Sequence, residues 1–225
     1  MTDIAGSTVL VTGANGGLGT EFVHQALTLG ADRVYAAART PKDWPDERVT
    51  PLRLDVNDAD SIAAAADTAS DTTILVNNAG ILRHGELLTG AIEDIAAQLT
   101  TNLFGPLLMT RAFARHLVPA KGAVVNVASV LSWLPLGKGY SVSKAALWSA
   151  TNGLRLELAP HGVQVVGAYL AYTDTPMTAG RESAGMNAPA DVVDAIYQGL
   201  RDGASEVLAD EITRSVRAGL SQPIA

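Results

Sequence analysis

The stretch TVLVTGANGGLGTEFVHQALTL, residues 8–29, decides the fold. A short β-branched apolar run leads into a glycine-rich turn, and a helix-compatible segment follows at once. A strand, such a turn and a helix start together form an anion site, because missing side chains let backbone N–H groups and the positive helix end approach a pyrophosphate. The spacing Gly13, Gly17, Gly19 differs from the commoner GxGxxG, so a plain tight turn is the alternative.

Further along the chain, short β-branched apolar runs alternate with longer Ala- and Leu-rich segments, which is typical of a buried parallel sheet covered by helices. The predicted strands are Thr8–Thr12, Arg33–Ala37, Pro51–Leu54, Thr73–Val76, Ala123–Val127, Gln164–Ala168 and Glu206–Leu208. The predicted helices lie near Leu18–Leu29, Ala59–Ala69, Ile92–Leu117, Ser141–Leu158 and Ala190–Arg201. Two prolines predict a loop or one short turn at Thr40–Arg48. No linker interrupts the pattern, so we expect one α/β domain over residues 1–225.

Composition argues against several classes of protein. The chain has 16 Lys and Arg against 23 Asp and Glu, a net charge of −7, which does not favour a nucleic-acid partner. It has no cysteine and four separated histidines, which predicts no metal site and fits a reducing compartment. We find no signal peptide and no apolar run near about twenty residues. These features predict a cytoplasmic protein without a membrane partner.

Tyr140 and Lys144 stand four residues apart in a predicted helix, so their side chains share one face. A cation beside a phenol favours the phenolate, and we expect the pair to exchange a proton near neutral pH. Tyr140 is therefore a candidate general acid or base. Because Tyr and Lys also meet at this spacing on ordinary amphipathic helices, the pair alone does not decide the function.

Arg39 ends the second predicted strand, where a site for NAD usually presents an acidic residue to the adenosine ribose. A guanidinium binds a 2′-phosphate, whereas a carboxylate repels it. With the glycine turn in place, this residue favours NADP(H) over NAD(H). A solvated loop cation is the alternative.

Four motifs occur in order: TGANGGLG at 12–19, NNAG at 77–80, Asn102 in TNLFG, and Ser129 in NVASV followed by Tyr140 and Lys144. This arrangement resembles the classical short-chain dehydrogenase/reductase family from the first strand to about residue 177. The resemblance implies a doubly wound Rossmann fold with a seven-stranded parallel sheet of order 3-2-1-4-5-6-7, flanked by helices. It also implies a homodimer or homotetramer that pairs through Ile92–Leu117 and Ser141–Leu158.

The resemblance further implies which residues form the site. The catalytic set would be Asn102, Ser129, Tyr140 and Lys144. The cofactor residues would be Gly13, Asn15, Gly16, Gly17, Leu18, Gly19, Arg39, Asp55, Val56, Asn78, Ala79, Gly80, Tyr140, Lys144, Thr173 and Thr175. Read from the residues alone, Ser129 is a hydroxyl at a strand end, where active sites of open sheets collect. Asn102, in contrast, reads as an exposed helix position.

Leu170-Ala171 replaces the Pro-Gly that usually follows the sixth strand in this family, which puts the cofactor geometry in doubt. Residues 178–188 should form a short lid over the substrate. The candidate pocket residues are His84, Leu131, Trp133, Leu136, Met177 and Met186. Because they are mostly apolar, they favour an uncharged ketone, aldehyde or alcohol.

The sequence therefore predicts an NADP(H)-dependent oxidoreductase that transfers a hydride between nicotinamide and a carbonyl or secondary alcohol, with Tyr140 as general acid/base. A non-catalytic NADP(H) sensor or scaffold of the same fold is the main alternative, since fold does not guarantee chemistry. An epimerase or dehydratase that acts on nucleotide sugars is less favoured, because such enzymes generally add a substrate domain.

Overall fold

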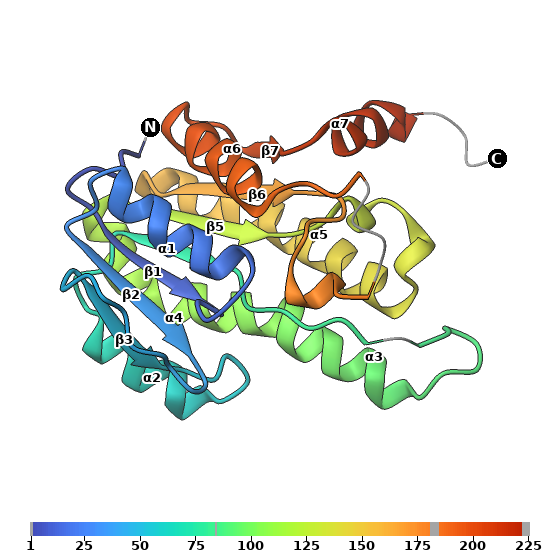
Figure 1. Cartoon of the computed structure of the whole chain (residues 1–225), viewed down its shortest axis with the longest axis horizontal. Coiled ribbons are helices and arrows are strands. Elements are labelled where there is room, and N and C mark those ends of the chain that lie inside the picture. The colour runs from blue at the N-terminus through green and yellow to red at the C-terminus, as the bar shows by residue number, and fades with distance from the viewer. Residues whose placement is uncertain (1, 84, 181–184, 222–225) are drawn as a thin grey trace.

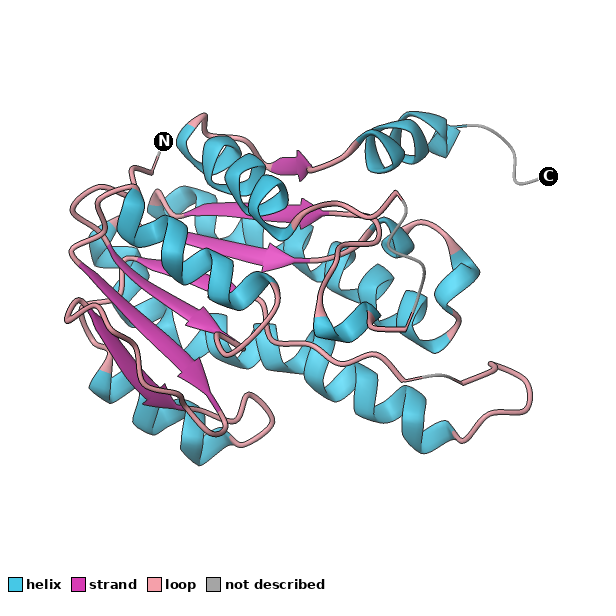
Figure 2. Ribbon diagram, in the orientation of Figure 1, coloured by secondary structure: helices cyan, strands magenta, loops and turns pink. Residues whose placement is uncertain are grey.

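A single parallel sheet of seven strands organises the computed structural model, which describes residues 2–83, 85–180 and 185–221 (Figures 1 and 2). The strands are β1 (Thr8–Thr12), β2 (Arg33–Ala38), β3 (Val49–Arg53), β4 (Ile74–Asn77), β5 (Ala123–Val127), β6 (Gln164–Tyr169) and β7 (Glu206–Leu208). Their spatial order is β3-β2-β1-β4-β5-β6-β7, and all neighbours are parallel. The predicted fold is confirmed.

Helices cover both faces of the sheet, as Figure 1 shows. One face carries α1 (Leu18–Thr28) and α6 (Pro189–Arg201). The other carries α2 (Ala59–Thr68), α4 (Gly105–Ala120) and α5 (Gly139–Leu158). The alternation along β1 explains the two cores, because successive strand residues point to opposite faces. Val9 and Val11 pack in the core with Phe22 of α1, whereas Leu10 packs in the core with Phe113 of α4.

Two helical predictions need correction. The segment predicted as one helix over Ile92–Leu117 consists of α3 (Ile92–Leu99), a π-helical turn over Thr100–Phe104, and α4. A final helix, α7 (Glu211–Ala218), lies beyond β7 and was not predicted. Its eight residues are too few for a convincing apolar period, and the signal that remained was the Asp210 cap before it.

The connection between β2 and β3 contains no helix, in agreement with the predicted loop at Thr40–Arg48. Trp44 of this loop packs against the α1 side of the core, with its ring centroid 5.6 Å from that of His24. The Lys42 ammonium lies 4.3 Å from the centroid of the same ring. The Trp44 side chain thus covers apolar surface beside α1 that a helix between β2 and β3 would cover in a longer connection.

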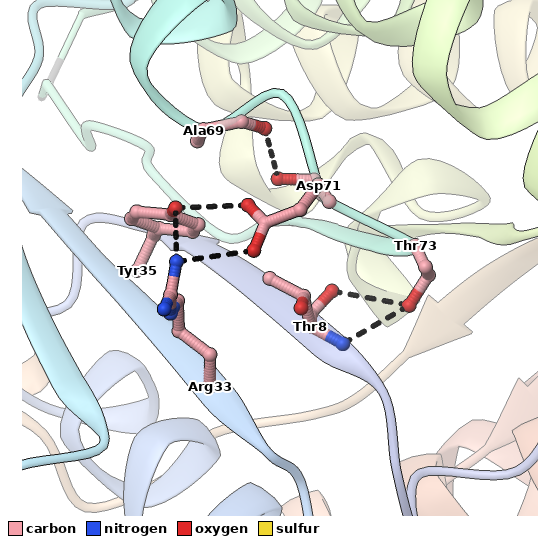
Figure 3. Close-up of polar contacts among 7 residues, drawn as sticks. Thr8, Arg33, Tyr35, Ala69, Asp71 and Thr73 are labelled. Atoms are coloured by element: carbon pink, nitrogen blue, oxygen red, sulfur yellow. Dashed lines mark hydrogen bonds and ion pairs between the residues drawn. The ribbon is translucent and has the colours of Figure 1, made fainter.

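Polar side chains link neighbouring strands near the amino-terminal ends of those strands (Figure 3). The Tyr35 hydroxyl donates to Asp71 Oδ1 over 2.8 Å, and Arg33 donates to Asp71 Oδ2 over 3.2 Å. Thr8 N–H donates to the Thr73 hydroxyl over 3.1 Å. Two cavities open at the opposite, carboxyl-terminal ends of the strands. None of the helices in the described ranges is long and apolar enough to cross a membrane.

Candidate active site

Two cavities, each of about 320 Å³, lie at the carboxyl ends of the strands and share Gly13, Ala79 and Gly80 in their walls. Ligands of open α/β sheets bind in this position, where the strand order reverses. We name them after the residues predicted for them: the catalytic cavity contains Ser129, Tyr140 and Lys144, and the adenosine cavity contains Arg39 and Asp55. Predicted residues in the wall of the catalytic cavity are Gly13, Gly16, Gly17, Leu18, Asn78, Ala79, Gly80, Ser129, Tyr140, Lys144, Thr173 and Thr175. Those in the wall of the adenosine cavity are Gly13, Asn15, Arg39, Asp55, Val56, Ala79 and Gly80.

The glycine turn leaves the backbone bare where the two cavities meet. Gly17 has φ of +54°, and a β-carbon there would lie 3.1 Å from Cβ of Thr175. Gly19 lines neither cavity, because its role is packing: a β-carbon on it would lie 2.1 Å from the Gly13 carbonyl oxygen. Asn78 Nδ2 donates to the Thr12 carbonyl over 2.9 Å and so joins the NNAG segment to the turn. At position 19, only glycine permits the close approach of the helix start to the Gly13 carbonyl.

The adenosine cavity has a free cation at its rim. Arg39 is exposed and makes no hydrogen bond or ion pair with any residue the structure describes. Asn15 Nδ2 donates to the Thr40 carbonyl over 2.6 Å, which holds the glycine turn against the end of β2. The Lys42 ammonium donates to the Asn15 carbonyl over 3.3 Å and to the Thr20 hydroxyl over 3.2 Å, so it contacts the glycine turn from outside the wall of the cavity.

Ser129, Tyr140 and Lys144 meet in the wall of the catalytic cavity. Ser129 follows β5 and accepts a hydrogen bond from Leu131 N–H over 3.1 Å, and its hydroxyl also hydrogen-bonds the Tyr140 phenol. One helical turn along α5, the Lys144 ammonium lies 5.7 Å from the centroid of the Tyr140 ring. It donates to the Val127 carbonyl over 2.8 Å, and its side chain is only 5% exposed.

Burial, rather than the neighbouring cation, controls the acidity of this pair. Burial raises the pKa of the Tyr140 phenol above its ordinary value of 10.0, and the hydrogen bond with Ser129 opposes that rise. Burial also lowers the pKa of Lys144 from 10.5 to about 8. Desolvation disfavours the charged form of either group. In this structure desolvation outweighs the effect of the Lys144 cation on Tyr140, which favours the neutral phenol and makes Tyr140 a potential proton donor.

Asn102 lies in the π-helical turn and is fully buried, so the exposed position suggested by the residues alone is wrong. Its Oδ1 accepts from Ile81 N–H over 2.9 Å, and its Nδ2 donates to the Ile81 carbonyl over 2.9 Å and to the Ser143 hydroxyl over 3.0 Å. The carboxamide lines neither cavity. It fixes the chain after the NNAG segment against α5, beside Tyr140 and Lys144.

The predicted substrate pocket is partly correct. Leu131 and Met177 line the catalytic cavity, as do Leu82, Leu170 and Tyr172, which were not predicted. Trp133, Leu136 and Met186 are absent from its described wall: Trp133 stacks on Tyr169 with centroids 4.5 Å apart, and Leu136 is 75% exposed. His84 and lid residues 181–184 lie outside the described residues.

Most of the chain matches one known protein family. The family model of the short chain dehydrogenases matches residues 7–185. The chain belongs to the short-chain dehydrogenase family. This short-chain dehydrogenase is 36% identical over 168 residues to the NADPH-dependent 1-acyldihydroxyacetone phosphate reductase of Schizosaccharomyces pombe, a match that covers 70% of this chain and 56% of that enzyme.

Solved structures of other short-chain dehydrogenases superpose on nearly the whole chain. A short chain dehydrogenase from Burkholderia cenocepacia, in complex with NADP, has a TM-score of 0.92 and 36% identity, covering 99% of this chain and 95% of that one. The NADPH-bound carbonyl reductase from chicken fatty liver has a TM-score of 0.83 and 27% identity, covering 92% and 100%. The chain thus shares the fold of these short-chain dehydrogenases over nearly its whole length, while its matches span 56–66% of the first curated relatives.

Proposed function

We propose that this short-chain dehydrogenase is an NADP(H)-dependent oxidoreductase that interconverts an uncharged carbonyl compound and its alcohol. The observation that carries the proposal is the convergence of Ser129, Tyr140 and Lys144 on one wall of a cavity that continues along the glycine turn. A hydroxyl, a phenol and an ammonium in this arrangement provide proton transfer, which hydride transfer to a carbonyl requires.

Each polar group of the catalytic cavity has one task. A bound nicotinamide supplies or accepts the hydride. Ser129 and Tyr140 donate hydrogen bonds to the carbonyl oxygen of the substrate, and Tyr140 then delivers its proton to the developing alkoxide. The Lys144 ammonium uses one donor on Val127, which leaves two for ribose hydroxyls of the cofactor, and its charge stabilises the phenolate that remains. Asn102 acts at a distance by fixing α5.

The preference for NADP(H) rests on the adenosine cavity. The guanidinium of Arg39, which has no partner among the described residues, suits a 2′-phosphate. Asp55 lies in the same wall, but its Oδ1 already accepts from Asn57 N–H over 2.9 Å. The three similar proteins compared above carry NADP or NADPH in their names, whereas a similar 3-ketoacyl-(acyl-carrier-protein) reductase from Brucella melitensis is complexed with NADH.

Substituting Arg39 tests this preference. In Arg39→Leu, KM for NADPH should rise by about tenfold or more while KM for NADH changes little, because one charge-assisted contact to phosphate is worth more than about 1.4 kcal/mol. Arg111→Leu, which removes an exposed arginine of α4 outside both cavities, is the matched control. An unchanged ratio of the two KM values would remove Arg39 from the phosphate site.

The substrate should be apolar around its carbonyl group. The catalytic cavity places Leu82, Leu131 and Leu170 around the reacting groups, with Lys144 as the one cation of its described wall. A phosphorylated substrate would find no second cation there. Oxidation of NADPH and of NADH against a broad panel of ketones and aldehydes tests this, and binding of NADPH without turnover of any carbonyl would favour the sensor alternative.

We further infer that the protein is a homodimer or homotetramer that pairs through α4 and α5. These helices and the π-helical turn between α3 and α4 leave large apolar side chains in solvent, among them Phe104 at 51% and Leu156 at 78% exposure. Leu156→Glu should weaken the assembly, whereas Ile212→Glu on α7 should not. Sedimentation velocity gives the answer, and a wild-type monomer at micromolar concentration would refute the inference.

A further inference from the structure

Asp210 is a nearly buried carboxylate, 8% exposed, that joins three segments distant in sequence. Its Oδ1 accepts from Thr213 N–H over 2.8 Å and caps α7. Its Oδ2 accepts from Ala171 N–H over 2.7 Å and from Asn187 Nδ2 over 3.1 Å. Hydrogen bonds to a buried carboxylate are about twice as strong as neutral ones. A helix cap needs only the first of these contacts.

The contact with Ala171 reaches the catalytic groups through a single peptide. The neighbouring Leu170 carbonyl accepts from Val130 N–H over 2.9 Å and from the Ser129 hydroxyl over 3.4 Å. Residues 170–173 and 175–178 then run along the wall of the catalytic cavity. The position of Ala171 therefore sets both the start of this wall and the acceptor that orients Ser129.

The contact with Asn187 holds the same segment at a second place, around Tyr172 and Asp174. Asn187 N–H donates to the Tyr172 carbonyl over 2.9 Å, and the Asn187 carbonyl accepts from Asp174 N–H over 3.1 Å. Asn187 Nδ2 reaches both the Tyr172 carbonyl, over 3.2 Å, and Asp210. Asp210 Oδ2 thus binds both Ala171, just after β6, and Asn187, just before α6.

We propose that Asp210 is a positioning residue for the active site, which sets the placement of the loop Leu170–Thr178 and, through the Leu170 carbonyl, of Ser129. Pro-Gly would stiffen the chain after β6, because proline fixes φ. Leu170-Ala171 has no such restraint. The Asp210 carboxylate, which follows the neighbouring strand β7, restrains this segment instead by accepting from Ala171 N–H. The effect on the cofactor depends on the proposed function, whereas the effect on the loop does not.

Asp210→Asn separates this role from helix capping. Asn caps helices as well as Asp does, so Thr213 keeps its acceptor. The amide group of Asn, however, offers only one oxygen, and its NH₂ would face the donors of Ala171 and Asn187. Asp58→Asn is the matched control, since Asp58 caps α2 with Oδ1 alone and accepts there from Asp60 and Ser61 N–H.

Hydrogen exchange tests the proposal without reference to the cofactor. In Asp210→Asn, peptides over 170–178 should exchange about tenfold faster or more than in wild type, while α7 over 211–218 keeps its protection. Asp58→Asn should leave the loop unchanged. Unchanged exchange in the loop, or equal loss of protection in loop and α7, would overturn the proposal in favour of capping alone.

Ligand binding and turnover supply the functional readout. Asp210→Asn should raise the Kd of NADPH by about tenfold and lower kcat, while the Kd of adenosine 2′,5′-bisphosphate, which lacks the nicotinamide half, stays at the wild-type value. Equal weakening of both ligands, or wild-type kinetics, would contradict the positioning role. Failure of the wild-type protein to bind NADPH would refute the proposed function instead, and the exchange result would still decide the loop.

Discussion

At the scale of single residues, burial shifts the pKa values of Tyr140 and Lys144 in opposite directions. Ser129, Tyr140 and Lys144 could be named because their spacing and motif context are local properties. The pKa values of Tyr140 and Lys144, in contrast, depend on their burial in the folded chain. Spacing alone therefore suggested an acidic phenol, whereas desolvation raises the pKa of Tyr140 and lowers that of Lys144 to about 8.

Lys144→Met should change how stability depends on pH. Folding lowers the pKa of Lys144 from 10.5 to about 8, so the unfolded chain binds this proton more tightly. The cost of burying the ammonium is fully present below pH 8 and disappears as pH rises to 10.5, which raises wild-type stability. The free energy of unfolding of Lys144→Met relative to wild type should therefore fall by about 3 kcal/mol across that window.

Urea unfolding at a series of pH values between 7 and 10.5 measures this difference. Lys121→Met, which removes an exposed lysine, controls for the general effect of a lost charge. A difference between Lys144→Met and wild type that does not change with pH would contradict the buried, destabilised ammonium.

At the scale of elements, the strands were predictable and the details of the helices were not. The predicted strands match the observed ones to within a few residues, because buried parallel strands are short runs of β-branched residues between turn signals. The π-helical turn at Thr100–Phe104 was not predictable, since it is stabilised by tertiary bonds of Asn102 to Ile81 and Ser143. Helix α7 has only eight residues, and the local signal for its start is the Asp210 cap, whose Oδ1 accepts from Thr213 N–H.

Asn102→Ala should destabilise the protein by about 2–4 kcal/mol, because it removes a buried carboxamide and leaves both backbone groups of the half-buried Ile81 without their partner. Thr100→Ala is the control within the same turn, and it should cost less than about 1 kcal/mol because the Thr100 hydroxyl is exposed. Denaturant unfolding compares the two variants. Equal costs would show that Asn102 is not what stabilises the turn.

At the scale of the whole molecule, the strand order brings the glycine turn, the NNAG segment and the end of β5 to one edge of the sheet. Local sequence patterns predicted the alternation of strands and helices, and the order of the sheet came from the resemblance to the family. The apolar part of the wall of the catalytic cavity was predicted only in part. Trp133 and Leu136 were expected in it but lie elsewhere, because the loop after Ser129 turns them toward Tyr169 and toward solvent.

The central claim is that Tyr140 is the proton donor of an NADPH-dependent carbonyl reduction, and single-turnover and steady-state kinetics of Tyr140→Phe test it most directly. The variant keeps the ring and loses only the hydroxyl, so NADPH should bind with a Kd close to wild type while kcat falls by about 10²–10⁴-fold, the usual contribution of general acid catalysis. Turnover within a few-fold of wild type, with the same carbonyl substrate and NADPH, would contradict the claim.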